Sequence, residues 1–177
     1  TIDDALQRAK ELVHWSKLLG ADTVKFQCHI LEDEKEKRDK SRWLWIEKNE
    51  KLTPLEEFWK PLKDFCDWQG LEMLVTPMSK MAAEKINPLV KRWKVGSADI
   101  VDIELLEYLK STDKPIILSV GMSTEEEISS AVKLLGDQIQ FILHCVSEYP
   151  TPEENINLNT IKYLKEKYPQ YKIGFSD

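Results

Sequence analysis

Two lysines that interrupt apolar segments are the residues of this chain best suited to binding a charged ligand. Lys25 and Lys94 each stand between two apolar residues in strand-like segments, so each should point to the face opposite its neighbours. Burying a lysine on the inner face of a sheet is costly unless an anion pairs with it, and lysine binds phosphate well. The two lysines together therefore favour a phosphate or carboxylate ligand. For either lysine alone, a stem that reaches solvent is the alternative.

Polar side chains also stand at the ends of the segments that we predict to be strands. They are Gln27, Thr76, Ser97, Ser119, Ser147 and Ser176. In parallel α/β sheets, ligands bind at the carboxyl ends of the strands, so we expect these groups to face a common ligand. Asp99 and Glu148 also follow strands and are candidate acids or bases, although most carboxylates in loops are simply solvated.

His144 ends an apolar segment and is expected to be a core histidine rather than a metal ligand. Cys145 is its neighbour, and adjacent residues of a strand point to opposite faces, which argues against a Cys–His nucleophile pair. The sequence holds no P-loop, no G-x-G-x-x-G and no H-E-x-x-H motif. Its odd number of widely spaced cysteines does not indicate a disulfide framework or a zinc site.

The segments that carry these residues alternate between strands and helices. We predict strands over 22–29, 71–76, 93–97, 115–120, 140–146 and 172–176, and helices over 3–19, 53–69, 79–86, 102–111, 123–135 and 157–168. This alternation predicts an α/β fold with a parallel sheet. The apolar residues that fall on helical spacing in the first helix are Ala5, Ala9, Leu12, Val13 and Leu19. Thr53 is expected to cap the second helix, and Ser123 and Glu126 to form a capping box at the fifth.

Residues 30–52 do not fit this alternation, because a run of charged residues is followed by an aromatic segment. One interpretation is a solvated loop whose few aromatic residues fold back on the domain. The other is a loop that follows a strand on the substrate side.

The composition limits the class of protein. With 25 Lys and Arg against 31 Asp and Glu, the net charge is −6, and 42% of the 177 residues are apolar. This is a globular composition, and its acidic balance argues against a general nucleic-acid binder. No apolar run approaches the roughly 18 residues of a transmembrane helix, so we expect no membrane span. No signal peptide is visible, and the cysteine usage favours a reducing cytoplasm.

Five short motifs occur in order along the chain. They are KFQ at 25–27, KVGSAD at 94–99, ILSVGM at 117–122, HCVSEYP at 144–150 and GFSD at 174–177. Together they closely resemble the N-acetylneuraminate (sialic acid) synthase family, the NeuB-like enzymes, over nearly the whole chain.

The resemblance implies a TIM (β/α)8 barrel followed by a small antifreeze-like domain. A complete barrel takes about 250 residues, so the 177 residues are expected to be a partial barrel domain with about strands 2 to 7. The first strand, the last βα units and the antifreeze-like domain are expected outside the chain, and the fragment alone is expected to be inactive. The implied reaction is a transferase-type condensation of phosphoenolpyruvate with N-acetylmannosamine and water, giving N-acetylneuraminate and phosphate. Mn²⁺ or Mg²⁺ assistance and a homodimer are also implied.

The resemblance also implies roles for individual residues. Lys25 and Lys94 match lysines that contact phosphoenolpyruvate, and Gln27 is a further substrate-binding candidate. Ser97, Ser119 and Ser176 match phosphate- and carboxylate-binding serines, and Ser147 is a substrate-binding candidate at a position that is Asn in some members and Ser in others. Thr76 and Tyr149 match the sugar side, and Asp99 matches an acidic catalytic position. Val120 departs from the family's usual Thr, and Asp99 from its more common Glu. The implied metal ligands lie outside the chain, and His144 is not one of them.

Two alternatives remain at this point. One is a sibling synthase that makes legionaminate or pseudaminate from another hexosamine, since such enzymes share every motif quoted. The other, from a different class, is a non-catalytic barrel that binds a phosphorylated metabolite or serves as a scaffold.

Overall fold

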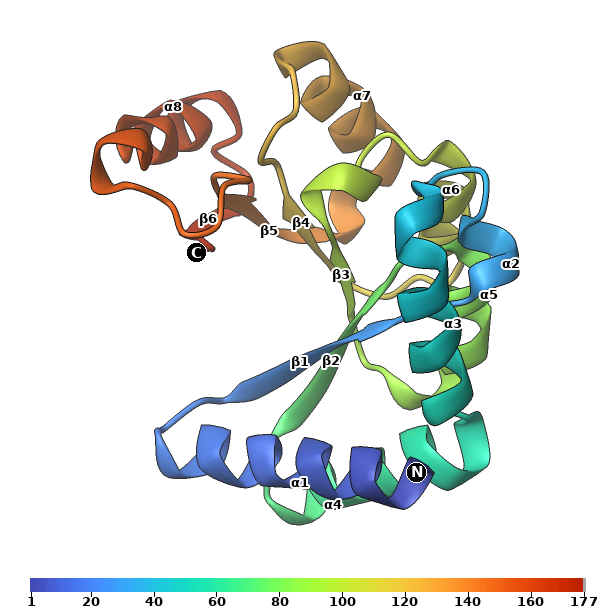
Figure 1. Ribbon diagram of the computed structural model, residues 1–177. Coiled ribbons are helices and arrows are strands. Elements are labelled where there is room, and N and C mark those ends of the chain that lie inside the picture. Colours follow the sequence, from blue (N-terminus) through green and yellow to red (C-terminus); the bar gives the residue numbers. More distant parts are fainter. Residues whose placement is uncertain (177) are drawn as a thin grey trace. The chain divides into compact units, whose positions relative to one another are not determined.

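The computed structural model describes residues 1–176 and divides the chain into two compact units, Thr1–Lys91 and Arg92–Asp177. Strands and helices alternate in both units, and the strands pair in parallel within each (Figure 1). Asp177, the last residue of the GFSD motif, lies outside the described residues. No helix among residues 1–176 combines the length and the apolar character needed to cross a membrane.

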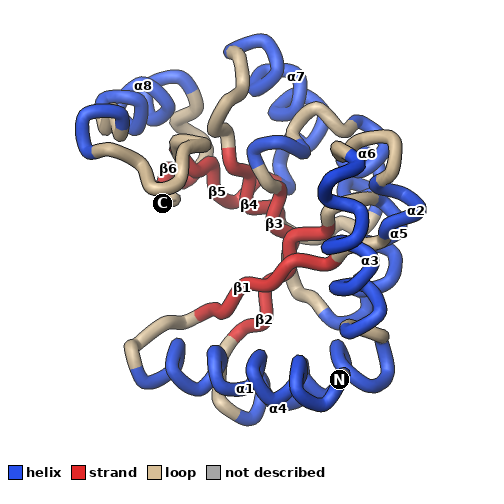
Figure 2. Tube along the Cα trace, viewed as in Figure 1, coloured by secondary structure: helices blue, strands red, loops and turns tan. Residues whose placement is uncertain are grey.

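The first unit is built on two strands. Its elements are α1 (Ile2–Leu18), β1 (Thr23–Cys28), α2 (Leu31–Glu34), a 3₁₀ turn at Lys40–Arg42, α3 (Trp43–Leu52), a π-helical turn at Leu55–Trp59, α4 (Lys60–Trp68), β2 (Glu72–Pro77), α5 (Lys80–Ile86) and a 3₁₀ turn at Asn87–Leu89. β1 and β2 pair so that Lys25 lies opposite Leu74 and Gln27 opposite Thr76. α1 and α4 run against each other (Figure 2).

The second unit carries four parallel strands that pair in chain order. Its elements are β3 (Trp93–Val95), a 3₁₀ turn at Ser97–Asp99, α6 (Ile103–Ser111), β4 (Ile116–Ser119), α7 (Glu125–Leu135), a 3₁₀ turn at Gly136–Gln138, β5 (Ile139–His144), a 3₁₀ turn at Glu153–Asn155, α8 (Asn159–Lys167) and β6 (Lys172–Phe175). Val95, Leu118 and Ile142 are register partners and are almost completely buried. They form the apolar layer of this unit, which leaves the next residue along each strand to face the other way.

The apolar spacing of the first helix is confirmed in part: α1 buries Ala9 and Val13, whereas Leu12 and Leu19 are 60% and 85% exposed. Two other local predictions are wrong. Thr53 does not begin a helix: it ends α3, and its hydroxyl donates to the Asn49 carbonyl.

The cap of α7 is shifted by one residue. Thr124, not Ser123, accepts from the backbone N–H of Glu127, and the Glu127 carboxylate accepts from the Thr124 N–H. The capping box is therefore formed by Thr124 and Glu127, and not by Ser123 and Glu126.

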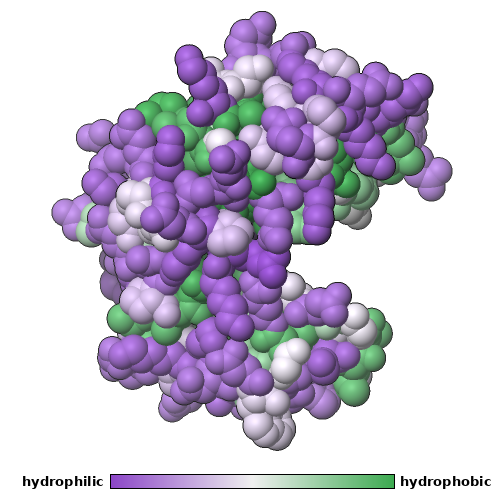
Figure 3. Space-filling view, turned by 180° about the vertical axis from the view of Figure 1, so that it is seen from behind, coloured by the Kyte–Doolittle hydropathy of each residue, from purple (hydrophilic) through white to green (hydrophobic). Residues whose placement is uncertain are grey.

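The face drawn in Figure 3 is mainly hydrophilic, with separate apolar groups between the hydrophilic ones. Among the exposed apolar residues are Trp15 on α1 and Trp68 on α4.

The capping box of α7 yields a first prediction. Thr124→Ala should lower the free energy of unfolding by about 1 kcal/mol, because it leaves an N-terminal N–H of the helix without its side-chain acceptor. Ser123→Ala, one residue away, is the matched control and should cost less than about half as much. Urea unfolding followed by circular dichroism measures both variants. An equal or larger cost for Ser123→Ala would contradict this assignment of the cap.

Candidate active site

The carboxyl ends of β3 and β4 bring a buried lysine and a serine together. The Lys94 side chain is only 6% exposed, and its Nζ donates to Ser119 Oγ and to the carbonyl oxygen of Val95, both at 2.6 Å. Lys94 lies opposite Ile117 in the register, so Ser119, two residues further along β4, shares its face. The structure confirms that Lys94 points away from its apolar neighbours and that its stem does not reach solvent.

A second cluster joins the ends of three neighbouring strands. Ser97 follows β3, Gly121 follows β4 and Cys145 follows β5. Ser97 Oγ lies 3.0 Å from Cys145 Sγ, and the Gly121 N–H donates to both, at 3.1 and 3.2 Å. A Cβ at Gly121 would come within 2.7 Å of Cys145 Sγ and 2.9 Å of Ser97 Oγ, so this approach requires glycine.

Asp99 ends the short 3₁₀ turn that follows β3 and is 4% exposed. Its N–H donates to the Gly96 carbonyl at 3.1 Å, which holds the turn at the carboxyl end of the strand. The structure thus places a buried carboxyl group two residues after Ser97. Val120, where the resemblance implied Thr, is buried and its N–H donates to the Leu143 carbonyl.

The remaining candidates of the second unit are less enclosed. Ser147 and Tyr149 follow β5 and are exposed, Tyr149 by 81%. Ser176 follows β6, and its N–H donates to the His144 carbonyl at 2.9 Å. The structure places all three at carboxyl ends of strands, as predicted, but does not bring the hydroxyls of Ser147 and Tyr149 into a buried cluster.

His144 and Cys145 face opposite sides of β5. The buried His144 ring donates from Nε2 to the Ile156 carbonyl at 2.7 Å, whereas Cys145 contacts Ser97 and Gly121. The prediction of a core histidine is confirmed, and the two side chains do not form a nucleophile pair.

In the first unit, Lys25, Gln27 and Thr76 share one face of the β1–β2 pair. Lys25 and Gln27 alternate along β1 with residues that are more buried, and Gln27 lies opposite Thr76 in the register. Thr76 is 3% exposed. Lys25 remains exposed, but the protein atoms near its amine partly desolvate it and lower its pKa. The combination of Lys25 with Lys94 around one anion stays a prediction.

Residues 30–52 are not an irregular loop, because they contain α2 and α3. A buried pair ties this segment to the end of β1: His29 Nδ1 lies 3.1 Å from both carboxylate oxygens of Glu34, which also accepts from the Ile30 N–H. The interpretation as a solvated loop is therefore wrong. Its place beside a substrate stays a prediction.

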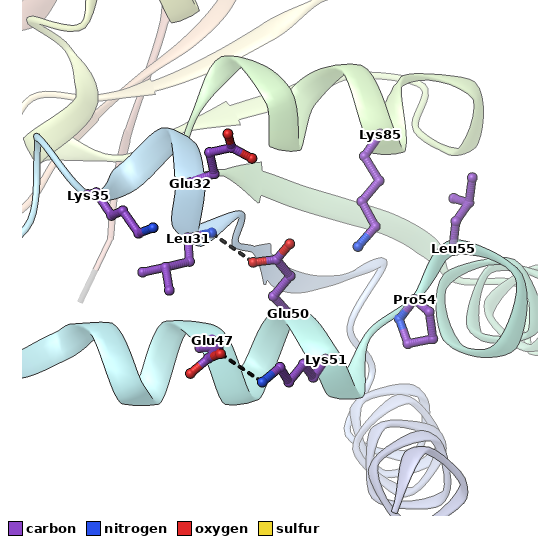
Figure 4. Close-up of a pocket in the computed structure, with 9 residues that line it drawn as sticks. All are labelled: Leu31, Glu32, Lys35, Glu47, Glu50, Lys51, Pro54, Leu55 and Lys85. Atoms are coloured by element: carbon purple, nitrogen blue, oxygen red, sulfur yellow. Dashed lines mark hydrogen bonds and ion pairs between the residues drawn. The ribbon is translucent and has the colours of Figure 1, made fainter.

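The same segment lines a cleft of about 580 Å³ (Figure 4). Glutamates and lysines alternate around it, including Glu50, which accepts from the Leu31 N–H at 2.8 Å, and Glu47, which pairs with Lys51 at 2.7 Å. The cleft is thus lined by side chains of both charges together with the apolar residues Leu31, Pro54 and Leu55.

No group of three or more His, Cys, Asp or Glu side chains within residues 1–176 could hold a metal ion. None of these residues is therefore assigned to the divalent metal that the resemblance implies, whose ligands are expected outside this chain.

The comparisons with known proteins agree with the motifs. The model of the NeuB family matches residues 12–177. The chain belongs to the NeuB family. The uncharacterized protein MJ1065 of Methanocaldococcus jannaschii is 40% identical over 172 residues, which are 95% of this chain and 50% of that protein. The pseudaminic acid synthase of Helicobacter pylori is 34% identical over 187 residues, covering 97% of this chain and 54% of the synthase. This NeuB-family chain thus spans about half the length of the curated relatives it matches.

Among solved structures, an N-acetylneuraminic acid (sialic acid) synthetase from Leptospira borgpetersenii in complex with citrate resembles this chain with a TM-score of 0.88. The two are 29% identical, and the match covers 98% of this chain and 60% of the synthetase. The predicted fold class, an α/β fragment of a TIM barrel, is confirmed.

Two residues of the site were not predicted, Gly121 and Cys145. The alternation of side chains along a strand could have predicted the place of Cys145. Cys145 lies two residues after Leu143, and Leu143 shares its face with Ser119 of the neighbouring strand. Gly121 gave a weaker signal, because a glycine after a strand has many uses.

The different surroundings of the three cysteines yield a second prediction. Burial raises the pKa of Cys28 to about 12 and that of Cys66 to about 11, whereas Cys145 is partly exposed. Iodoacetamide reacts with thiolates, so at about pH 8 it should alkylate Cys145 in the folded protein and spare the other two. Peptide mass spectrometry measures the labelling, with unfolded protein as the control in which all three react. Rapid labelling of Cys28 or Cys66 before unfolding would contradict the prediction.

Proposed function

We propose that the protein carrying this chain is a sialic acid synthase, which condenses phosphoenolpyruvate with N-acetylmannosamine and water to give N-acetylneuraminate and phosphate. The observation that carries the proposal is the buried Lys94 ammonium held against Ser119 at the carboxyl ends of β3 and β4. Membership of the NeuB family and the likeness to a sialic acid synthetase support it. The proposed class is a transferase that works in the cytoplasm as a homodimer, and the fragment alone is proposed to be inactive.

The proposed reaction forms one carbon–carbon bond and one carbon–oxygen bond, and it breaks one carbon–oxygen bond. The enol carbon C3 of phosphoenolpyruvate attacks the aldehyde carbon of the sugar, water adds at C2, and phosphate leaves with its bridging oxygen. A bound divalent metal, with ligands proposed outside this chain, would polarise the aldehyde.

The residues of this chain supply binding and proton positions for that reaction. Lys94 offers a fixed positive charge to the phosphate or carboxylate oxygens, and the hydroxyls of Ser97 and Ser119 offer hydrogen bonds beside it. Asp99 is proposed as the acid or base near the reacting carbons. Lys25 and Gln27 of β1 are proposed as further contacts to phosphoenolpyruvate, and Thr76 and Tyr149 as contacts to the sugar.

A sibling synthase is the second candidate, because the similarity to the pseudaminic acid synthase of Helicobacter pylori favours it. In that case the same anion-binding residues would bind phosphoenolpyruvate, and a diacetamido hexosamine would replace N-acetylmannosamine. A non-catalytic barrel that only binds a phosphorylated metabolite is the third outcome of the tests below.

A substrate panel on the full-length protein tests the choice of sugar. Phosphate release from phosphoenolpyruvate should be fastest with N-acetylmannosamine, and each sugar is assayed with Mn²⁺ and with Mg²⁺. Omission of the sugar is the control for background hydrolysis. Release only with a diacetamido sugar would favour the sibling synthase, and binding of phosphoenolpyruvate without turnover of any sugar would favour the binding barrel.

Removal of the buried charge tests the proposed role of Lys94. Lys94→Met should lower kcat/KM for phosphoenolpyruvate by at least about thirtyfold, because losing one partner of a buried charge contact costs about 2 kcal/mol or more. The matched control is Lys110→Met, which removes an exposed lysine from α6 and should leave the rate unchanged.

Ser119→Ala is a milder second variant that keeps the charge, and circular dichroism checks the fold of all three. The proposed role is wrong if folded Lys94→Met binds phosphoenolpyruvate as tightly as the unchanged protein.

A further inference from the structure

Cys145 contacts Ser97, one of the proposed anion-binding residues, and has no role in the reaction proposed above. Its Sγ lies 3.0 Å from Ser97 Oγ and 3.2 Å from the backbone nitrogen of Gly121. The Gly121 N–H is shared, since it also donates to Ser97 Oγ at 3.1 Å. The three groups thus form a closed triangle across the ends of three adjacent strands.

The hydrogen-bonding capacity of these groups limits how the triangle can be arranged. A serine hydroxyl donates one hydrogen bond and accepts two, and a thiol is a weak donor and a weak acceptor. The Gly121 N–H occupies one acceptor position of Ser97 Oγ and also reaches Sγ. The remaining contact has two arrangements: either the Ser97 hydroxyl donates to the thiol, or the thiol donates to the hydroxyl oxygen.

A bound anion beside Ser97 favours the arrangement in which the thiol donates to the Ser97 hydroxyl oxygen. A hydroxyl hydrogen bond to an ionised acceptor is roughly twice as strong as one to a neutral acceptor, so the Ser97 proton turns toward a phosphate or carboxylate oxygen when one is bound. The Cys145 S–H then supplies the second hydrogen bond to Ser97 Oγ. Hydrogen bonds in such a chain polarise and strengthen one another.

We propose that Cys145 is a positioning residue, whose thiol donates to Ser97 and so directs the Ser97 hydroxyl proton at the bound anion. This inference rests on the proposed function, in which that anion is phosphoenolpyruvate. Gly121 is needed for the same arrangement, because only glycine lets Ser97 Oγ and Cys145 Sγ come within hydrogen-bond distance of its N–H and of each other.

Double-mutant cycles on the full-length protein test the proposal. Cys145→Ala should raise KM for phosphoenolpyruvate about three- to tenfold, the range expected for one hydrogen bond, while kcat and KM for the sugar stay within about twofold. Cys145→Ser restores a donor on a shorter bond and should recover part of the affinity. In a Ser97→Ala background, Cys145→Ala should change KM by less than about twofold, because the residue through which the thiol acts is gone.

Calorimetry with phosphoenolpyruvate and with inorganic phosphate gives a readout that does not depend on turnover. Cys66→Ala, which removes a thiol from α4 outside the site, is the control and should leave both affinities unchanged. If the unchanged protein binds both anions without turnover, the proposed function fails, but the cycle still tests Cys145 by affinity.

Several results would overturn the role of Cys145. These are an unchanged anion affinity in Cys145→Ala, effects of the Ser97 and Cys145 variants that simply multiply, or a loss of kcat and of thermal stability without a selective change in anion affinity. Failure of the unchanged protein to bind either anion would overturn both this inference and the proposed function.

Discussion

The buried ammonium of Lys94 is the interaction on which the candidate site depends. A lysine with 6% exposure is stable only where polar groups meet its charge, and the 2.6 Å contacts to Ser119 Oγ and to the Val95 carbonyl do so. Ser119 can reach Nζ because β3 and β4 pair in parallel, with Lys94 opposite Ile117. The apolar layer of Val95, Leu118 and Ile142 holds that register, since a slip by one residue would turn the lysine into the core.

The second requirement is the close approach of three strand ends. Because Gly121 has no side chain, Ser97 Oγ and Cys145 Sγ come within hydrogen-bond distance of its N–H. The cost is the larger conformational entropy that glycine loses on folding. What results is a set of small polar groups whose positions follow from the backbone and not from long, flexible side chains. Such preorganised donors lose little freedom when an anion binds.

The sequence predicted the strands and the faces of their residues better than the helix ends. The apolar neighbours Trp93 and Val95 settle which face Lys94 occupies, because a strand has only two faces, and the adjacent positions of His144 and Cys145 put these two on opposite faces. The missed helix α3 has no such regularity: Leu44 and Trp45 are exposed while Ile46 is buried, so its apolar residues do not form one stripe. At α7, Ser123 and Thr124 are adjacent and both can cap a helix, and only the backbone geometry selects Thr124. The contact of Cys145 with Ser97 required three strand ends to be placed together.

Anion binding and sugar selection in the proposed enzyme would depend on different parts of the chain. The proposed anion-binding residues stand on strands and at strand ends, where the parallel register holds their positions and a substitution disturbs the core. The segment over residues 30–52 instead joins β1 to α4 through short helices, a buried His29–Glu34 pair and a cleft of mixed charge. Under the proposed function, the strand ends would bind the anion that is common to synthases named for different sugar acids, and a segment such as this one would contact the sugar.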